Sequence, residues 1–481
     1  MQTKFFSALK NAFHPLVLLS FVAGFVLMAY ELAAARILAP SIGSSMYVWT
    51  SVIGTIMVAL SVGYYAGGKL ADARNEKLDV VALCFATAGL ISVTLVMYPP
   101  LLVGIEVWQI DQRIKGVVAA LVLFAPASVT LGMISPYVAK LNITSLKTSG
   151  QEVAILSAVN SVGSIAGTFA AGFILFSMLG SRETLLVLLI TMLLAGWLIV
   201  PRQYVAPKVI FSIALVLAVF GSVGGNMAGA IDTPSATYQI REYRNNEDRL
   251  VRGIIAGPNG VQSGVYVDAP DELVFWYTRA MAEVIEQVET PESILILGGG
   301  TYTLPRYLAQ TYPEAQIDVV EIDPKLVDVA REHFFYNDPP NVTIHHTDAR
   351  VFVNQAAAQY DVILADVYND ASVPFSLMTK EYGEHLQAMV APDGIVVANA
   401  IASTEGQCRP LYDAMNEAYR TLGDAHLVRS QSYGTVRGNM LMVYGAKLPD
   451  LPGYRMVEAP KTTTYTDDFM PAEALQQACW R

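Results

Sequence analysis

The sequence predicts a multi-pass α-helical membrane domain followed by an α/β domain with a doubly wound parallel sheet. Hydrophobic residues make up 53% of the 481 residues and charged residues only 15%, whereas soluble domains average about 25% charged residues. Residues 1–230 hold 13 basic and 8 acidic residues, and residues 231–481 hold 18 and 34. Apolar runs long enough to span a bilayer occur only in the first part, and strands alternate with helices only in the second.

Seven apolar runs in residues 1–230 reach the roughly 20 residues that a membrane-spanning helix needs. Glu31 and Arg36 lie in or near the first run. Ionisable groups at membrane depth suggest function, but pairing with each other or with lipid headgroups is the interpretation we favour. The glycines of Ser161-Val-Gly-Ser-Ile-Ala-Gly167 predict close helix packing, and Asn160 predicts a hydrogen bond between helices. The predicted runs are residues 15–39, 47–68, 78–99, 116–138, 153–178, 184–201 and 207–229.

A β-hairpin subdomain is expected over residues 231–290, ahead of the α/β domain at 291–481. Residues 235–268 contain short alternating stretches broken by Asn245-Asn246 and Pro258-Asn259-Gly260, which is typical of hairpins.

Five buried strands then alternate with helical stretches, and this order predicts a parallel sheet with its ligand site at the carboxyl ends of the strands. Helical stretches are expected near residues 304–311 and 409–422, and Pro324 suits the start of another. The predicted strands are 293–297, 317–322, 342–345, 361–366 and 394–398.

Residues at these strand ends suit a nucleoside ligand. Gly298, Gly299 and Gly300 follow the first strand and permit close approach of the backbone. Glu321 ends the second strand, where an acid accepts hydrogen bonds from ribose hydroxyls. Asp348 follows the third, and Asp366 ends the fourth. As Thr301, Tyr302 and Thr303 replace the later glycines of a pyrophosphate-binding loop, an S-adenosylmethionine-type ligand fits better than a dinucleotide. Helix capping is the alternative for each acid.

Residues 235–445 resemble the spermidine synthase (aminopropyltransferase) family, and the seven-run N-terminal part is similar to its membrane-fused bacterial branch. That resemblance implies a Rossmann-like fold of the S-adenosylmethionine-dependent methyltransferase type. The tail, Thr466-Asp-Asp468 with Pro471, is also similar to that branch. The resemblance is carried by Tyr238-Gln239, Gly260-Val-Gln262, Asp271-Glu-Leu273 with Tyr277, Leu297-Gly-Gly-Gly300, Glu321-Ile-Asp323, Asp348-Ala-Arg350, Tyr360-Asp-Val-Ile-Leu-Ala-Asp366 and Pro392-Asp-Gly394.

The resemblance implies transfer of an aminopropyl group from decarboxylated S-adenosylmethionine to an amine such as putrescine. Asp366 is then the catalytic carboxylate, with Tyr277 and Tyr368 as the phenols beside it. The implied donor-binding residues are Gln262, Gly298, Gly299, Gly300, Glu321 (ribose) and Asp348 (adenine). The implied residues on the amine-substrate side are Tyr238, Gln239 and Asp370.

Three departures from the family pattern affect the amine-binding chemistry. The family's Gly-Gly-Gly-Asp-Gly-Gly reads Gly298-Gly299-Gly300-Thr301-Tyr302-Thr303, so the acid that binds the donor's terminal amine is missing. Tyr-His-Glu reads Tyr277-Thr278-Arg279, and Asp-Ser-Ser-Asp reads Asp366-Val367-Tyr368-Asn369 with Asp370 one place later. Asp370 substitutes for the displaced acid, or it caps a helix or lies on a loop surface.

Two alternatives therefore stay open beside the aminopropyltransferase. One is a methyltransferase that uses intact S-adenosylmethionine on an amine or a lipid, and the other is a transporter with a ligand-sensing former enzyme domain. Three cysteines and six histidines without ligand spacing predict no metal site. The acidic second part disfavours nucleic acid and favours a small cationic amine, although solubility alone accounts for acidity. A homo-oligomer is left open.

The charges predict the orientation in a bacterial inner membrane. With the amino terminus inside, the inner segments hold nine Lys and Arg and the outer loops hold three, which the positive-inside rule favours. Seven spans then put the α/β domain in the periplasm, whereas the donor is made in the cytoplasm. A re-entrant or broken element at 99–110 would change the count, as would transport of the donor. We leave the side open and favour the periplasm.

Overall fold

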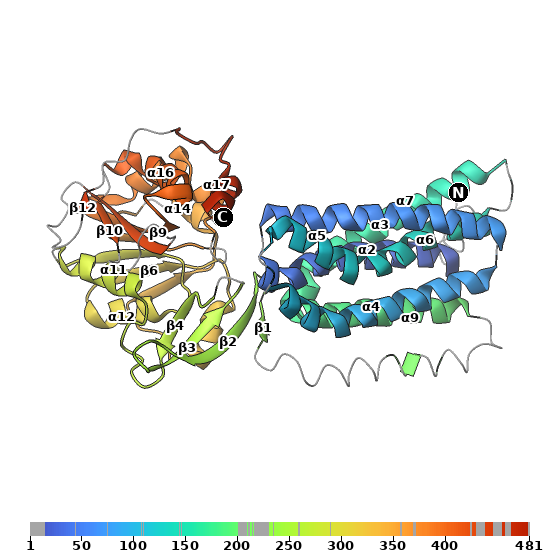
Figure 1. Cartoon of the computed structure of the whole chain (residues 1–481), viewed down its shortest axis with the longest axis horizontal. Helices are drawn as coiled ribbons and strands as arrows, with labels where there is room; N and C mark the ends of the chain where they lie inside the picture. The colour runs from blue at the N-terminus through green and yellow to red at the C-terminus, as the bar shows by residue number, and fades with distance from the viewer. Residues whose placement is uncertain are drawn as a thin grey trace, which may run out of the picture. The chain divides into compact units, whose positions relative to one another are not determined.

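The computed structural model describes most of the chain in two compact units, Met1–Tyr238 and Gln239–Arg481 (Figure 1). The residues described are 15–200 apart from 44, 75, 107, 109, 144 and 146; 209, 212, 213 and 215; and 230–479 apart from 234, 258–259, 289, 356–357, 369–371, 424–425, 430–437, 446–454 and 457–462.

The N-terminal unit consists of long apolar helices. Five of them are long and apolar enough to cross a membrane, or six if a bent pair counts as one span. The five helices and the bent pair together match the first six predicted runs. Nearly all of the seventh run, 207–229, lies outside the described residues. The helices are α2 (Pro15–Ile42), α3 (Met46–Ala73), α4 (Lys77–Glu106), α5 (Gln112–Leu123), α6 (Ala125–Asn142), α7 (Ser149–Ala170) with the π-helix η1 (Ala171–Leu175) and α8 (Phe176–Met178), and α9 (Ser181–Ile199).

The helices differ from the predicted runs, and from the alternative element at 99–110, in two places. Residues 99–106 are no separate element, because α4 continues through Pro99 and Pro100 and buries Leu102 and Ile105 in the core of the unit. The run predicted at 116–138 as one helix is instead α5 and α6, bent by 56°. The break falls just before Pro126, in the first turn of α6, where proline suits a helix start but lacks the N–H that would continue the preceding helix.

Close backbone contact joins the helices of the N-terminal unit. The pairs that lie side by side are α3 with α6, α2 with α7, and α4 with α9 (Figure 1). A Cβ added to Gly167 would lie 2.2 Å from the Phe25 carbonyl oxygen, so only glycine permits this approach. The Asn160 amide donates to the Ser20 carbonyl oxygen at 3.0 Å. These contacts confirm the packing roles predicted for the 161–167 run and for Asn160.

A small sheet follows, with strand order β1-β2-β3-β4, in which β2, β3 and β4 pair in antiparallel fashion. Its strands are β1 (Ala230–Asp232), β2 (Thr237–Arg244), β3 (Leu250–Ile255) and β4 (Ser263–Tyr266). β2 and β3 pair from Gln239–Ile255 to Arg244–Leu250, as the alternation between turn signals predicted.

The second sheet of the C-terminal unit has strand order β12-β10-β11-β9-β8-β5-β6-β7. β7-β6-β5-β8-β9 are parallel, and β10, β11 and β12 extend the β9 edge in antiparallel fashion. The five parallel strands confirm the predicted strands, while the antiparallel extension was not predicted. The bounds are β5 (Ser293–Leu297), β6 (Gln316–Val320), β7 (Val342–His345), β8 (Tyr360–Ala365), β9 (Val390–Ala402), β10 (His426–Arg429), β11 (Gly438–Gly445) and β12 (Arg455–Met456).

Helices cover both faces of this sheet, which is the doubly wound arrangement. One core joins α11 (Trp276–Glu286), α12 (Thr303–Thr311) and α13 (Leu326–His333) to residues such as Val362, Leu364 and Val397. The other joins α14 (Ala349–Gln355), α15 (Lys380–Ala388), α16 (Arg409–Ala418) and α17 (Ala472–Cys479) to the opposite face. The short 3-10 turns are η3 (Phe375–Leu377), η4 (Gly406–Cys408) and η5 (Arg420–Leu422), and a disulfide links Cys408 to Cys479.

Candidate active site

The predicted ligand residues gather where the strand order reverses. β5 pairs with β6 on one side and with β8 on the other. The chain therefore runs from β5 to β6 in one direction across the sheet and from β8 to β9 in the opposite direction. A crevice at the carboxyl ends forms at such a switch point in an open α/β sheet. The glycine run follows β5, Glu321 follows β6, Asp366 follows β8, and β9 continues beside it.

Gly298 brings the glycine run against the end of β8. Its φ is +99°, and a Cβ there would lie 2.3 Å from the Asp366 carbonyl oxygen. Any other residue would therefore meet both an unfavourable backbone conformation and a steric clash. The backbone nitrogen of Asp366 donates to the Leu297 carbonyl oxygen at 2.9 Å. The glycine run and Asp366 are thus held next to each other.

Glu321 supports the glycine run from the end of β6. Its carboxylate accepts hydrogen bonds from the Gly299 and Asp323 backbone N–H groups, each at 2.9 Å. Burial raises its pKa, and these backbone hydrogen bonds oppose the rise. Each carboxylate oxygen can accept more than one hydrogen bond, so the side chain retains acceptor capacity for a ligand hydroxyl.

Asp348 caps a helix in this structure. Its Oδ1 accepts hydrogen bonds from the backbone N–H groups of Arg350 and Val351, at 2.8 and 3.1 Å. The side chain is exposed at the carboxyl end of β7, at the start of α14. Capping and adenine binding are compatible, because capping uses Oδ1.

Asp366 and Tyr277 are electrostatic neighbours at the centre of the site. Burial raises the pKa of Asp366, and hydrogen bonds from Asn399 and Tyr277 lower it in part. Burial and the nearby Asp366 carboxylate keep the pKa of Tyr277 well above its usual value. The Tyr277 hydroxyl also lies 3.5 Å from the carbonyl oxygen of Gln262. The pair can orient an amine and accept its proton.

Asn399 is a site residue that the sequence analysis missed. Its amide Nδ2 donates to Oδ1 of Asp366 at 2.8 Å, and the residue is only 4% exposed. A single amide within the apolar Val396–Ala402 stretch was the available signal. The sequence alone does not show that Asn399 lies beside Asp366, because this depends on the strand register that pairs Ala398 with Ala365.

Tyr368 ties the segment after β8 to β9. Its hydroxyl donates to the Asn399 carbonyl oxygen at 2.8 Å and accepts from the Ile401 N–H at 2.9 Å. Gln239 accepts a hydrogen bond from Arg241, and Tyr238 is a largely buried neighbour on β2. Asp370 lies outside the described residues.

The positions that depart from the family pattern serve packing here. Thr301 is buried, and its hydroxyl lies 2.7 Å from that of Ser263 on β4. Tyr302 has φ of +56°, and its buried ring centroid lies 4.9 Å from that of Tyr336. The place of the missing acid is thus taken by a hydroxyl pair that joins β4 to the start of α12.

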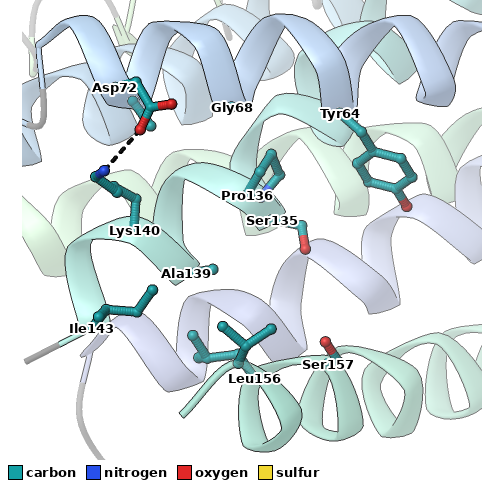
Figure 2. Close-up of a pocket in the computed structure, with 12 residues that line it drawn as sticks. Tyr64, Gly68, Asp72, Ser135, Pro136, Ala139, Lys140, Ile143, Leu156 and Ser157 are labelled. Atoms are coloured by element: carbon teal, nitrogen blue, oxygen red, sulfur yellow. Dashed lines mark hydrogen bonds and ion pairs between the residues drawn. The ribbon is translucent and has the colours of Figure 1, made fainter. Parts of the chain in front are cut away.

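No cluster of metal-ligating side chains occurs among the described residues. The N-terminal unit has an open cavity of about 390 Å³ between α3, α6 and α7. Figure 2 shows Asp72 and Lys140 paired at its edge, with Tyr64 and Ser157 further along. The Lys140 nitrogen lies 2.8 Å from the Asp72 carboxylate, and the other lining groups are apolar or hydroxyl-bearing.

Comparison with known proteins agrees with the resemblance. Residues 274–416 match the family model described as spermine/spermidine synthase domain. A polyamine aminopropyltransferase of Vibrio vulnificus is 33% identical over 166 residues, 34% of this chain and 54% of that protein. One from Streptococcus uberis is 34% identical over 191 residues, 37% of this chain and 60% of that protein. The chain thus spans little more than half the length of these curated relatives.

A probable spermidine synthase from Corynebacterium glutamicum is a structural neighbour, with 25% identity and a TM-score of 0.39 over 46% of this chain and 80% of that one. The matched family range contains Tyr277, Asp366 and Asn399, and it excludes the long apolar helices. The resemblance found in the sequence is therefore confirmed for the C-terminal unit.

Proposed function

We propose that this chain, whose residues 274–416 carry a spermine/spermidine synthase domain, is a membrane-bound aminopropyltransferase acting on a small amine. Its donor is decarboxylated S-adenosylmethionine. The observation that carries the proposal is the part-buried Asp366 carboxylate, which lies beside the glycine run and accepts a hydrogen bond from Asn399. A base in such a position matches the chemical need of amine alkylation.

The donor is assigned to the cradle made by the glycine run and Glu321. The Glu321 carboxylate accepts ribose hydroxyl hydrogens, and Asp348 reaches the adenine amine while capping α14. Gln262 lies along the donor, since its carbonyl oxygen is 3.5 Å from the Tyr277 hydroxyl. The donor has no phosphate, which suits a glycine run that continues into Thr301 and the buried Tyr302.

The reaction requires a neutral amine, whereas a free alkylammonium has a pKa near 10. Asp366 accepts a proton from the ammonium, and the freed nitrogen pair attacks the donor's aminopropyl carbon. The new N–C bond forms as the C–S bond breaks, and its electron pair stays on sulfur as a neutral thioether. The enzyme supplies alignment and a base, because the sulfonium has already activated the carbon.

The N-terminal helices are assigned to the bacterial inner membrane, and the C-terminal unit to its periplasmic side. Five or six described helices have the necessary length and apolarity. The Cys408–Cys479 disulfide supports an oxidising compartment. The charge asymmetry supports an amino terminus inside, and the seven predicted runs, the last of them outside the described residues, then put the C-terminal unit outside. Access to a cytoplasmic donor then requires its passage across the membrane.

A second function, methyl transfer from intact S-adenosylmethionine, is favoured by one observation. Thr301, bonded to Ser263, cannot neutralise the donor's terminal ammonium as an acid would. The two activities differ in which carbon leaves the sulfonium.

Mass spectrometry of products tests the proposal. The full chain is incubated with each donor and a panel of diamines and polyamines, with Asp366→Asn as the matched inactive control. Aminopropylated amine from the decarboxylated donor is the expected product. A methylated product from intact donor would replace the proposal with the methyltransferase. Donor binding without product from any acceptor would overturn both and favour a ligand-sensing role.

A further inference from the structure

We propose that Asn399 is a positioning residue that presents Asp366 as an ionised, correctly oriented base. The inference deepens the proposed function and rests on it. It starts from three observations: a buried amide, a hydrogen bond to the catalytic carboxylate, and an amide oxygen left without a partner.

Asn399 lies beside Asp366 because of the pairing between β8 and β9. Ala365 pairs with Ala398, so the residues that follow them, Asp366 and Asn399, are neighbours at the carboxyl ends. Val362, Leu364 and Val397 share one core, and alternation along the strands puts Asp366 and Asn399 on that same face. Tyr277 reaches this face from α11. Three elements therefore converge on one carboxylate.

Chemistry fixes which way the amide faces. The Nδ2 lies 2.8 Å from Oδ1 of Asp366, and only the NH₂ end of an amide can donate to a carboxylate oxygen. The Asn399 Oδ1 must then face the other way, where it is buried with no hydrogen-bond partner among the described residues. The amide is oriented by its contact with Asp366 alone.

The unpartnered oxygen argues against a purely structural role. A buried acceptor without a donor destabilises a fold, and its presence calls for an explanation. An apolar side chain of similar size would continue the strand without that penalty. The amide is retained for what its N–H does to Asp366.

That effect is to keep a buried base usable. Burial favours the protonated form of Asp366, which cannot accept a proton from the substrate. An N–H donated to the carboxylate favours the ionised form. The same N–H also fixes the orientation of the carboxylate through Oδ1. The other titratable groups that face the pair from the described elements are Tyr277 of α11 and Tyr368 of the segment after β8. The loop after β5 contributes the glycine run, which does not titrate.

The test is a series of variants of the full-length protein, assayed for aminopropyl transfer across pH. Asn399→Leu removes the N–H that donates a hydrogen bond to Asp366. The acidic limb of the rate profile is therefore expected to move to higher pH, and kcat at neutral pH is expected to fall about 10-fold or more. Asn399→Asp puts a second carboxylate against the first, so it is expected to lose more activity than the Leu variant. Asn399→Gln keeps the amide and is expected to recover part of the loss.

Asn416→Leu is the matched control. Asn416 is also a buried asparagine of the C-terminal unit, but it accepts a hydrogen bond from Tyr444. Its replacement is expected to lower the melting temperature and to leave the pH profile in place. Asn399→Leu is expected to melt within about 4 °C of wild type with a displaced profile. An unmoved acidic limb in a folded Asn399→Leu protein would overturn the proposal.

A second readout separates this inference from the proposed function. The carboxyl C=O stretch of Asp366, identified by its loss in Asp366→Asn, is followed by infrared spectroscopy as pH rises. Its titration is expected to shift to higher pH in Asn399→Leu, whether or not the protein turns over any amine. If the wild-type protein transfers no aminopropyl group but the Asp366 titration still shifts in Asn399→Leu, the proposed function is refuted and the positioning role is kept. An unchanged titration would refute the positioning role.

Discussion

At the scale of residues, the candidate site is built around two carboxyl groups that are shielded from water. Asp366 and Glu321 are both acids whose pKa values are raised by burial. Hydrogen bonds oppose the rise in pKa of each acid. The donors are backbone N–H groups for Glu321 and side chains for Asp366. This difference matches the tasks proposed for them, because a binding acid can stay fixed while a base must exchange its proton.

Replacing Asp366 by Asn is expected to lower kcat by about 10²-fold or more, because the proton acceptor is lost. Donor affinity, measured by calorimetric titration, is expected to change little, since Glu321 and the glycine run are untouched. A folded Asp366→Asn protein with near-normal turnover would contradict the assignment.

The same substitution has a predicted effect on stability. The folded pKa of Asp366 lies above its usual value of 3.8, so the folded state binds this proton more tightly than the unfolded state does. The stabilisation is present at low pH and is lost as pH rises through the folded pKa. Asp366→Asn should therefore gain stability relative to wild type from acid to neutral pH, as denaturant unfolding measures. A gain that does not grow with pH would contradict the raised pKa.

Because position 301 is a threonine, we expect weak selection between decarboxylated and intact S-adenosylmethionine. The site offers a hydroxyl bonded to Ser263 where the family has an acid, so the ammonium of the decarboxylated donor meets no countercharge there. Calorimetry is expected to give affinities for decarboxylated and intact S-adenosylmethionine that differ by less than about 10-fold. Strong preference for the decarboxylated form would show that another acid, such as Asp370, binds the ammonium.

At the scale of elements, periodicity allowed the parallel strands and their helices to be predicted, because buried strands read as short apolar runs between turn signals. The break between α5 and α6 was missed because the hydropathy is continuous across Phe124 and only Pro126 marks it. Asn399 and the Thr301–Ser263 contact arise from side chains that meet only once strand register is known.

The C-terminal segment is held to the unit by several independent contacts. Arg350 pairs with Asp467 at 2.6 Å, and Gln476 of α17 donates to the Val373 carbonyl oxygen at 2.9 Å. The disulfide joins Cys408 to Cys479 across a sequence separation of 71. This segment thus reaches the stretch that follows Asp366 in the chain.

Removing the disulfide with Cys408→Ser and Cys479→Ser is expected to release α17. A cross-link closing a loop of this length stabilises by roughly 3–5 kcal/mol in the chain-entropy description. Hydrogen exchange of residues 472–479 in the full chain should therefore accelerate. Cys84→Ala, at the free buried cysteine of α4, is the control and should leave that exchange unchanged. Two reactive thiols at positions 408 and 479 in the wild-type protein as isolated from cells would show that the bond does not form.

At the scale of the whole molecule, helices long and apolar enough to cross a membrane are joined to a unit that holds the candidate active site. The side of the membrane proposed for that unit decides how the proposed donor reaches it. A reporter fused after Arg481 is expected to be active in its periplasmic form and inactive in its cytoplasmic form. A cytoplasmic signal would overturn the seven-span count and remove the need to move the donor across the bilayer.

The central claim is that this chain moves an aminopropyl group, and isotope labelling tests it most directly. Purified full-length protein is incubated with decarboxylated S-adenosylmethionine labelled with ¹³C in the aminopropyl chain and with unlabelled putrescine. The account predicts labelled spermidine and unlabelled methylthioadenosine in equal amounts, and neither with Asp366→Asn. Label that stays on the nucleoside, or methylthioadenosine released without a labelled amine, would contradict it.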